Sequence, residues 1–234
     1  VIVGSSSEAG HATITAGITA ASEGDVVCVE AGNYNEDLTI NKGITLASID
    51  GPSTTTISNG VHITANGVTL EGFTIGSGDI QGETACVYLA PTLNNIEVSY
   101  NELIEDGGTK APRGIITTGS GTYNGVHIVQ NKIHDLVTGI YINSHSGIIE
   151  INHNEFYNCE AGIGGTNHAT IEYNVFHDNG EAIGLDDSSS DVTIQYNNFL
   201  GEDKVKNYGS TLKDAKNNWW GIDGIDVEGN VNAD

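Results

Sequence analysis

The chain has 234 residues, and its 31 acidic and 8 basic side chains give it a formal net charge of −23. This charge argues against nucleic acid and anionic membranes as partners, because both would repel the protein. No stretch approaches the ~20 consecutive apolar residues of a membrane span, so membrane insertion is not expected. Cation binding, a solubility role and adaptation to high salt all fit the charge.

The sequence begins at Val1 and has no signal peptide, so we expect a mature chain processed or excised from a longer protein. We therefore predict an extracellular or cell-surface location. Cys28, Cys86 and Cys159 lie far apart and form no CxxC motif. We expect them to be small buried residues, and one disulfide with a free thiol is the alternative.

The N-terminal residues 12–22 are predicted to form a short amphipathic helix with Ile14, Ile18 and Ala21 on one face. Because open sheet edges promote aggregation, we expect this helix to cover the end of a β structure. A turn at Gly24-Asp25 follows, and then predicted strands at 26–29, 37–40 and 44–46.

A repeat occupies most of the remaining chain. The pattern apolar-x-x-Asn-x-apolar recurs at intervals of 20 to 30 residues, and a second apolar column, including Gly139-Ile140 and Gly162-Ile163, follows eight residues later. Each repeat therefore holds about three short strands separated by turns. The asparagines of the pattern are Asn101, Asn131, Asn154, Asn174 and Asn197, with a less well aligned sixth copy at Asn217.

The period is too short for a propeller blade and lacks helical spacing, and leucine is too scarce for leucine-rich repeats. The sequence predicts an all-β, right-handed, single-stranded parallel β-helix in which rungs stack ~4.8 Å apart. We expect one domain over 1–234, with an N-terminal cap at about 1–25, rungs at about 26–212 and a closing segment at about 213–234.

We expect the repeated asparagines to lie at a bend, because asparagine tolerates the left-handed conformation. Their amides can hydrogen-bond one another from rung to rung, so the prediction is a structural ladder and not a set of ligands. At the C-terminal end, Trp219 and Trp220 are expected to close the core. An exposed tryptophan that stacks on a sugar ring is the alternative for one of them.

Two segments carry a family resemblance. "GDVVCVEAGNYNEDLTINKGITL" resembles the opening rungs of pectin-methylesterase-like and pectate-lyase-like β-helix proteins. "NNWWG" resembles the closing segment of surface-protein β-helix modules, a group that includes NosD-like copper-binding and CASH-type carbohydrate-binding domains. The resemblance implies the fold and leaves the activity open, since these families include lyases, hydrolases, epimerases, esterases and non-catalytic surface modules.

Pectate-lyase-type catalysis requires an arginine or lysine as the base and Ca²⁺ held by acidic side chains. The only arginine, Arg113, lies with Lys110 in an insertion, and stacking should bring a second insertion beside it. Lys110 and Arg113 are therefore the catalytic candidates of a lyase, and a solvated loop with surface ion pairs is the alternative. The substrate-binding candidates in the two insertions are Asp79, Glu83, Glu105 and Asp106.

Other chemistries of these families are less well supported. The Asp-Phe-(Ile/Val)-Phe-Gly motif of methylesterases is absent, and Asp186-Asp187 has no matching Asn-Thr-Asp motif for polygalacturonase chemistry. A copper site would need clustered methionine, histidine or cysteine, and the chain has no methionine.

Two further features are candidates for binding. Tyr173 and Tyr196 precede repeat asparagines and would form a strip that either binds sugars or simply packs between rungs. The turn 186–191 alternates carboxylates with small residues, which suits Ca²⁺ held by Asp186, Asp187 and Asp191, and a solvated acidic turn is the alternative.

Together these features favour a non-catalytic extracellular module of a surface, adhesion or self-assembling protein that binds carbohydrate. The alternative function is a Ca²⁺-dependent lyase, or a related enzyme, that acts on acidic polysaccharide. The expected partners are glycans and further copies of the chain.

Overall fold

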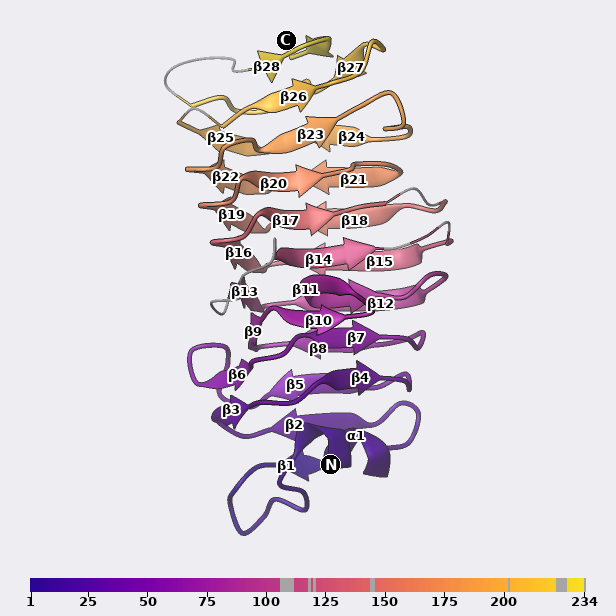
Figure 1. Cartoon of the computed structure of the whole chain (residues 1–234), viewed down its shortest axis with the longest axis vertical. Helices are drawn as coiled ribbons and strands as arrows, with labels where there is room; N and C mark the ends of the chain where they lie inside the picture. Colours follow the sequence, from indigo (N-terminus) through magenta and orange to yellow (C-terminus); the bar gives the residue numbers. More distant parts are fainter. Residues whose placement is uncertain are drawn as a thin grey trace.

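The computed structural model describes residues 1–105, 112–117, 119, 121–143, 146–201, 203–221 and 227–233. The chain winds as a coil in which a typical turn, or rung, adds one strand to each of three sheets (Figure 1). Each strand pairs in parallel with its counterpart one rung later, as Ile151 pairs with Ile171 and Ile171 with Ile194. This is the predicted parallel β-helix.

Sheet A consists of β1 (Ile2–Val3), β2 (Val26–Val29), β5 (Thr45–Ser48), β8 (Thr69–Glu71), β12 (Asn94–Ser99), β15 (Asn124–Val129), β18 (Ile149–Asn152), β21 (Ala169–Glu172) and β24 (Thr193–Gln195). Sheet B consists of β3 (Gly32–Tyr34), β6 (Thr55–Ile57), β9 (Thr74–Gly76), β13 (Glu102–Ile104), β16 (Lys132–His134), β19 (Glu155–Tyr157), β22 (Val175–His177) and β25 (Asn198–Leu200).

Sheet C consists of β4 (Leu38–Ile40), β7 (Val61–Ile63), β11 (Glu83–Leu89), β14 (Arg113–Thr117), β17 (Thr138–Tyr141), β20 (Ala161–Gly164), β23 (Ile183–Leu185), β26 (Val205–Asn207) and β28 (Val227–Glu228). A short strand, β10 (Gly78–Ile80), pairs antiparallel with β11, and β27 (Lys213–Asp214) pairs with β29 (Val231–Asn232).

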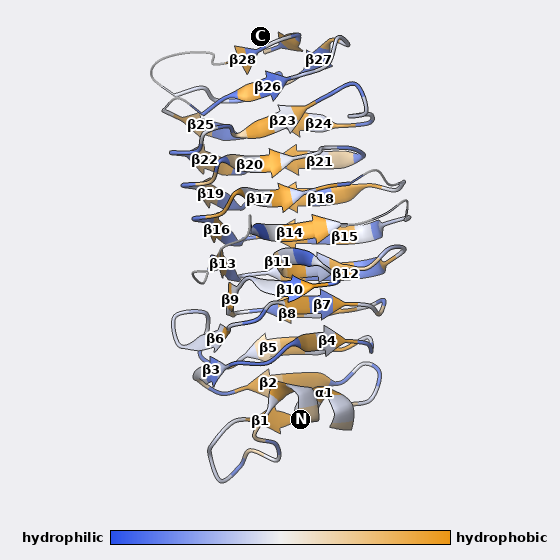
Figure 2. Ribbon diagram, viewed as in Figure 1, coloured by the Kyte–Doolittle hydropathy of each residue, from blue (hydrophilic) through white to orange (hydrophobic). Residues whose placement is uncertain are grey.

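Inward side chains form continuous columns along the coil axis, because strand residues alternate between buried and more exposed positions. In sheet B the rings of Phe156, Phe176 and Phe199 stack at centroid distances of 4.8 and 5.1 Å. Much of sheets A and C is hydrophobic and the connections between strands are more hydrophilic (Figure 2). Each rung therefore buries its apolar residues only when the next rung covers them.

Helix α1 (Ile14–Ala20) closes the N-terminal end of the coil, as predicted for residues 12–22 (Figure 1). Ile14 and Ile18 are buried in the core, and the Thr13 side chain caps the helix by accepting the Ala16 N–H. At the C-terminal end of the helix, the Lys42 ammonium donates to the carbonyl groups of Ile18, Thr19 and Ala21. No helix among the described residues is long and apolar enough to cross a membrane.

At the C-terminal end, Trp220 continues the aromatic column. Its ring stacks on Phe199 at 4.6 Å and is only 7% exposed, whereas Trp219 is 53% exposed. One tryptophan closes the core and the other faces solvent. The three cysteines, all among the described residues, form no disulfide. Cys86 and Cys159 are buried as expected, whereas Cys28 is only partly buried.

A ladder of asparagines lines the bend between sheets A and B. Asn154 Oδ1 accepts the Asn131 backbone N–H at 2.9 Å, and Asn154 Nδ2 donates to Asn174 Oδ1 at 3.1 Å and to a carbonyl of the preceding rung at 2.8 Å. The same contacts recur in both directions along the column, so the buried amides satisfy one another. The members are Asn101, Asn131, Asn154, Asn174, Asn197 and Asn218.

The prediction of Asn217 as the last member is wrong by one residue. Asn198 pairs with Trp219, and this register places Asn218 over Asn197, whose N–H it accepts at 2.9 Å. The left-handed conformation that was expected at the ladder asparagines is also displaced, to one residue earlier. It falls on the residue before each asparagine, including Tyr196 (φ 58°) and Asn217 (φ 59°), because this turn lets the following amide point inward.

Candidate functional site

One described residue from each of the two predicted insertions meets the other on the outer face of sheet C. The Arg113 guanidinium is 2.6 Å from Glu83 Oε2 and lies 4.9 Å over the ring centre of Tyr141. The predicted site residues Lys110 and Asp106 lie outside the described residues. Both the charge and one face of Arg113 are therefore engaged within the protein, which suits an anchor better than a base.

The rest of this region is a small outer core. Strands β10 and β11 form a hairpin that packs Ile80 against Tyr88, Ala85 and Ile116. Asp79 lines a separate hollow of about 170 Å³ beside His62, and Glu105 follows β13 on the bend toward sheet C. The structure thus joins Arg113 to Glu83 and places Asp79 in a neighbouring hollow.

The predicted tyrosine strip exists at the bend between sheets A and B. Tyr173 and Tyr196 are each about half exposed, and their ring centres are 5.4 Å apart in a stacked arrangement. His153 stacks on the other face of Tyr173 at 5.2 Å. Because a sugar stacks on the face of an aromatic ring, a column whose faces cover one another offers mainly ring edges and hydroxyl groups.

The three aspartates of the predicted calcium turn have separate partners. Asp186 accepts the Ser188 N–H at 2.7 Å, and the Ser188 hydroxyl group with the turn amides lowers the pKa of Asp186. Asp187 accepts amides from the next rung, while Asp191 pairs with His168 at 3.1 Å. Among the described residues, no three His, Cys, Asp or Glu side chains are arranged to hold a metal ion. Calcium binding at this turn stays a prediction.

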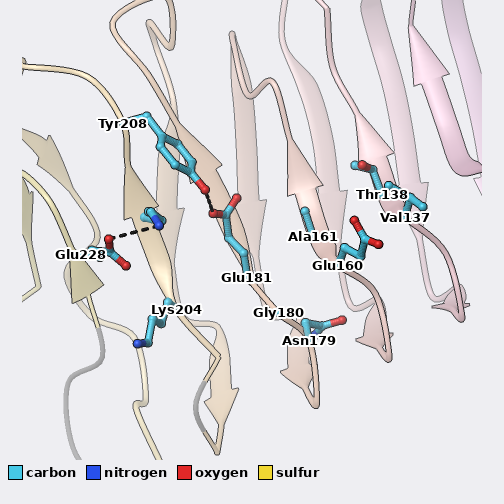
Figure 3. Close-up of a pocket in the computed structure, with 11 residues that line it drawn as sticks. Val137, Thr138, Glu160, Ala161, Asn179, Gly180, Glu181, Lys204, Tyr208 and Glu228 are labelled. Atoms are coloured by element: carbon cyan, nitrogen blue, oxygen red, sulfur yellow. Dashed lines mark hydrogen bonds and ion pairs between the residues drawn. The ribbon is translucent and has the colours of Figure 1, made fainter. Parts of the chain in front are cut away.

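A larger hollow, of about 640 Å³, lies on the outer face of sheet C toward the C-terminal end. Its walls come from five successive rungs, β17, β20, β23, β26 and β28, and the connections beside them (Figure 3). We call it the sheet C hollow. Its lining includes Thr138, Glu160, Glu181, Lys204, Lys206, Tyr208 and Glu228.

A chain of polar contacts orders one wall of this hollow. The Tyr208 hydroxyl donates to Glu181 Oε2 at 2.5 Å (Figure 3). The Lys206 ammonium lies 4.8 Å over the Tyr208 ring centre. Lys206 also pairs with Glu228 at 3.1 Å. Although Tyr208 is 65% exposed, these contacts hold its ring in one place.

The same contacts set the protonation states. The hydrogen bond to Glu181 raises the pKa of Tyr208, and the hydrogen bond to Glu228 raises the pKa of Lys206. Both shifts favour the protonated form of each group. A general base must be deprotonated, so these contacts oppose proton uptake by either side chain.

Glycine at position 184 makes the arrangement possible. A Cβ atom there would lie 2.3 Å from Glu181 Oε1 and 3.8 Å from the Tyr208 ring. The outward side of β23 is thus left bare so that Glu181 and Tyr208 can meet over the strand.

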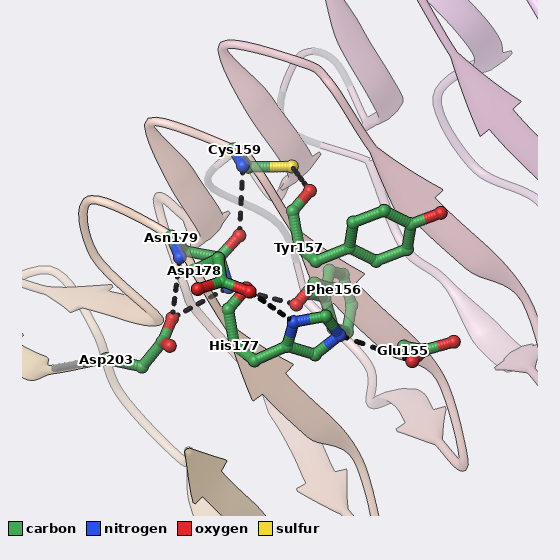
Figure 4. A network of polar contacts seen from close by, with 8 residues as sticks. All are labelled: Glu155, Phe156, Tyr157, Cys159, His177, Asp178, Asn179 and Asp203. Atoms are coloured by element: carbon green, nitrogen blue, oxygen red, sulfur yellow. Dashed lines mark hydrogen bonds and ion pairs between the residues drawn. The ribbon is translucent and has the colours of Figure 1, made fainter. Parts of the chain in front are cut away.

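The bend between sheets B and C borders this hollow and carries a second polar column (Figure 4). Cys159 donates its backbone N–H to Asn179 Oδ1 at 3.0 Å, and Asn179 Nδ2 donates to Asp203 Oδ1 at 2.7 Å. Burial raises the pKa of the Cys159 thiol to about 12, so this cysteine is not a nucleophile.

On the outer face of sheet B, Tyr157 is stacked between His134 and His177 at 4.3 and 5.1 Å. Both nitrogens of His177 face carboxylates, Nε2 toward Glu155 at 3.2 Å and Nδ1 toward Asp178 at 2.9 Å. Burial lowers the pKa of His177, but the hydrogen bonds to Asp178 and Glu155 outweigh this effect and leave the pKa raised.

The sequence analysis missed the sheet C hollow, because its residues come from five rungs. One signal was available. Four of the eight basic residues fall between positions 204 and 216, so the cations of this acidic chain gather toward its C-terminal rungs.

Comparisons with known proteins agree with the fold. The family model described as "Right handed beta helix region" matches residues 59–231. No curated protein matches the chain. An alginate lyase from Paenibacillus sp. str. FPU-7 has a similar structure, with a TM-score of 0.68, 14% identity, and coverage of 93% of this chain and 95% of that one.

Two other solved structures are similar. The pectin methylesterase PemA from Erwinia chrysanthemi has a TM-score of 0.51 and 14% identity, with coverage of 89% of this chain and 79% of that one. The A-module of the Azotobacter vinelandii mannuronan C-5 epimerase has a TM-score of 0.50 and 17% identity, with coverage of 94% and 71%. At these identities the likeness establishes the architecture alone.

Proposed function

Since this chain belongs to the right-handed β-helix family, whose fold also carries the polysaccharide-acting enzymes named above, we propose that it is a non-catalytic module that binds a polysaccharide in the sheet C hollow. The observation that carries the proposal is Tyr208. Its ring is largely exposed at the hollow, yet it is held by Glu181 and Lys206.

Sugar recognition favours such a side chain. A tyrosine ring covers the apolar face of a pyranose, and a ring that is already ordered loses little entropy on binding. The volume of the hollow lies within the range of ligand sites, and carboxylates around the ring can accept hydrogen bonds from sugar hydroxyl groups. Binding is supported over catalysis because Arg113, Lys206 and Tyr208 each contact a carboxylate of the protein.

Affinity electrophoresis tests the proposal. The wild-type protein should be retarded in gels that contain a soluble polysaccharide, and Tyr208→Ala should weaken its Kd by about tenfold. Tyr196→Asn is the matched control, because Tyr196 is a half-exposed tyrosine of the stacked strip and asparagine tolerates its left-handed backbone. Loss of binding in Tyr196→Asn but not in Tyr208→Ala would show that the polysaccharide binds at the tyrosine strip. No retardation in any of a broad set of polysaccharides would refute the proposal.

The second candidate is the Ca²⁺-dependent lyase, and the observation in its favour is that the two insertions meet through Arg113 and Glu83. A lyase would produce unsaturated sugar ends that absorb in the ultraviolet, and Arg113→Ala would abolish the gain in absorbance. An unchanged absorbance with alginate and polygalacturonate in the presence of Ca²⁺ would exclude this activity on those polymers.

The proposal includes an extracellular or cell-surface site of action and, for the self-assembling version, association of copies. Sedimentation velocity across a concentration series tests the second part, because self-association would raise the sedimentation coefficient with concentration.

A further inference from the structure

We infer that the sheet C hollow takes a neutral, hydroxyl-rich polysaccharide and rejects polyuronates. This inference rests on the proposed function and specifies its ligand class. It departs from the acidic substrates considered for the lyase, and it follows from the charges and hydrogen-bonding groups that line the hollow.

The charges of the lining disfavour an acidic polymer. The charged side chains are three glutamates, Glu160, Glu181 and Glu228, and two lysines, Lys204 and Lys206. Lys206 and Glu228 pair at 3.1 Å and largely compensate each other, which leaves two glutamates against one lysine and so a net negative lining. The whole chain adds a formal net charge of −23. A polyuronate would bring one carboxylate per sugar to within a Debye length, about 8 Å at physiological ionic strength, of these glutamates.

The hydrogen-bonding groups of the lining also favour sugar hydroxyl groups over carboxylates. A uronate carboxylate only accepts hydrogen bonds, whereas a sugar hydroxyl group also donates them. Glu160 is exposed at the hollow, and within the described part of the chain its carboxylate makes no hydrogen bond or ion pair. Glu181 and Glu228 add oxygens that retain acceptor capacity beside their bonds to Tyr208 and Lys206. The wall is therefore rich in acceptors and matches hydroxyl groups.

The amide of Asn179 does not alter this balance of donors and acceptors. Its Nδ2 group donates to Phe156 O at 2.9 Å, to His177 O at 3.1 Å and to Asp203 Oδ1 at 2.7 Å. Its two amide hydrogens are thus used within the fold. Asn179 lines the hollow without offering a donor to a uronate.

Affinity electrophoresis with four probes tests the inference: hydroxyethyl cellulose, a galactomannan, alginate and polygalacturonate. We expect at least one neutral polymer to retard the wild-type protein, both uronate polymers to leave it unretarded, and Tyr208→Ala to weaken the neutral interaction by about tenfold. Binding of the neutral polymer should persist in about 0.5 M NaCl, because it does not depend on attraction between charges.

Variants at Glu160 test whether the charge of the hollow excludes polyuronates. Glu160→Lys should gain retardation in uronate gels at low salt and lose it at high salt. Glu160→Gln removes the negative charge without adding a positive one, so it should gain less retardation in uronate gels than Glu160→Lys. Circular dichroism and Tm should match the wild-type protein in both variants, since Glu160 is exposed.

The outcomes separate the two claims. Tyr208-dependent binding of uronates by the wild-type protein would overturn the inference and leave the proposed function intact. Absence of binding to all four polymers and to a wider set would overturn the proposed function, and the inference with it. Neutral binding that Tyr208→Ala does not weaken would likewise remove the hollow as the site.

Discussion

Asn179 and Asp203 occupy successive positions of one buried column, in which Asp203 Oδ1 accepts both the backbone N–H of Asn179 at 3.1 Å and its Nδ2 group at 2.7 Å. Asp203 is 1% exposed, and within the described chain its second oxygen, Oδ2, has no hydrogen-bond partner. Asp203 thus places a carboxyl group at the position where the preceding rung has the side-chain amide of Asn179. Burial raises the pKa of Asp203.

We predict that Asp203→Asn stabilises the protein at neutral pH by about 1–3 kcal/mol, because an amide adds a donor where a buried carboxylate is unpaired. A carboxyl group with a raised folded-state pKa contributes its stability below its unfolded pKa of about 3.9, and this contribution is lost as pH rises through the folded value. The advantage of the variant should therefore grow with pH. Urea unfolding at pH 4 and pH 8 measures it.

Glu160→Gln is the control for this measurement. It removes one negative charge near the same bend but from an exposed side chain, so it should change the free energy of unfolding by less than about 0.5 kcal/mol. Equal effects of the two variants would assign the gain to net charge and contradict the role of burial.

The contribution of His177 to stability should also decrease as pH rises, in this case because its two carboxylate partners favour the imidazolium. Its raised pKa means that the imidazolium stabilises the fold fully below the unfolded value of about 6.5, and that this contribution is lost as pH rises through the folded pKa. We expect His177→Gln to lower Tm at pH 5 and to differ less from the wild type at pH 9. The effect should stay below about 1 kcal/mol, because Glu155 and Asp178 are well exposed and solvent screens them. A Tm difference that does not vary with pH would show that the ring acts only by packing on Tyr157.

The register of the asparagine ladder predicts a contrast between adjacent residues. Asn218→Ala should cost about 1–3 kcal/mol, because the Asn197 N–H and Nδ2 groups lose the Asn218 oxygen that they share at 2.9 and 3.1 Å. Asn217→Gly should cost much less, since the exposed Asn217 lies outside the ladder and glycine accepts its φ of 59°. Chemical denaturation of both variants measures the free energy of unfolding. A larger decrease in Asn217→Gly than in Asn218→Ala would support Asn217 as the ladder member, as expected from the sequence.

The two tryptophans predict a second contrast. Trp220→Ala should cost about 3–5 kcal/mol, because it removes the ring that covers Phe199 at the end of the aromatic column. Trp220→Phe keeps a ring there and removes the indole N–H, which is buried without a hydrogen-bond partner among the described residues, so it should be milder. Trp219→Ala should stay within about 0.5 kcal/mol, since that side chain is 53% exposed. Thermal unfolding of the three variants measures the order, and a cost of Trp219→Ala equal to that of Trp220→Ala would refute it.

Local sequence was sufficient to predict the coil. Phe156, Phe176 and Phe199 recur at the same place in the repeat, and a residue that packs in one rung must meet its counterpart in the next. The cap was equally visible, because Ile14 and Ile18 form an apolar face at the start of the chain. The last rung was misjudged by one residue, since "NNWW" offers two adjacent asparagines and two adjacent tryptophans, and only strand pairing chooses between them.

The candidate site was much harder to predict. Arg113 and Glu83 were expected to meet because equal insertions in stacked rungs lie side by side, and they do. Glu181, Lys206 and Tyr208 carry no motif, and their meeting depends on which residues point outward and on the missing side chain of Gly184.

The sequence by itself determined that this chain folds as a stack of similar rungs, since its repeated apolar residues and asparagines satisfy one another only when stacked. It also determined that one amide per rung would join a ladder. Only the tertiary structure decided where neighbouring rungs leave a hollow, which tyrosines are exposed, and which carboxyl group is buried with one oxygen unpaired among the described residues. The reason is physical: a repeat specifies contacts between equivalent positions, whereas a site arises where neighbouring rungs differ.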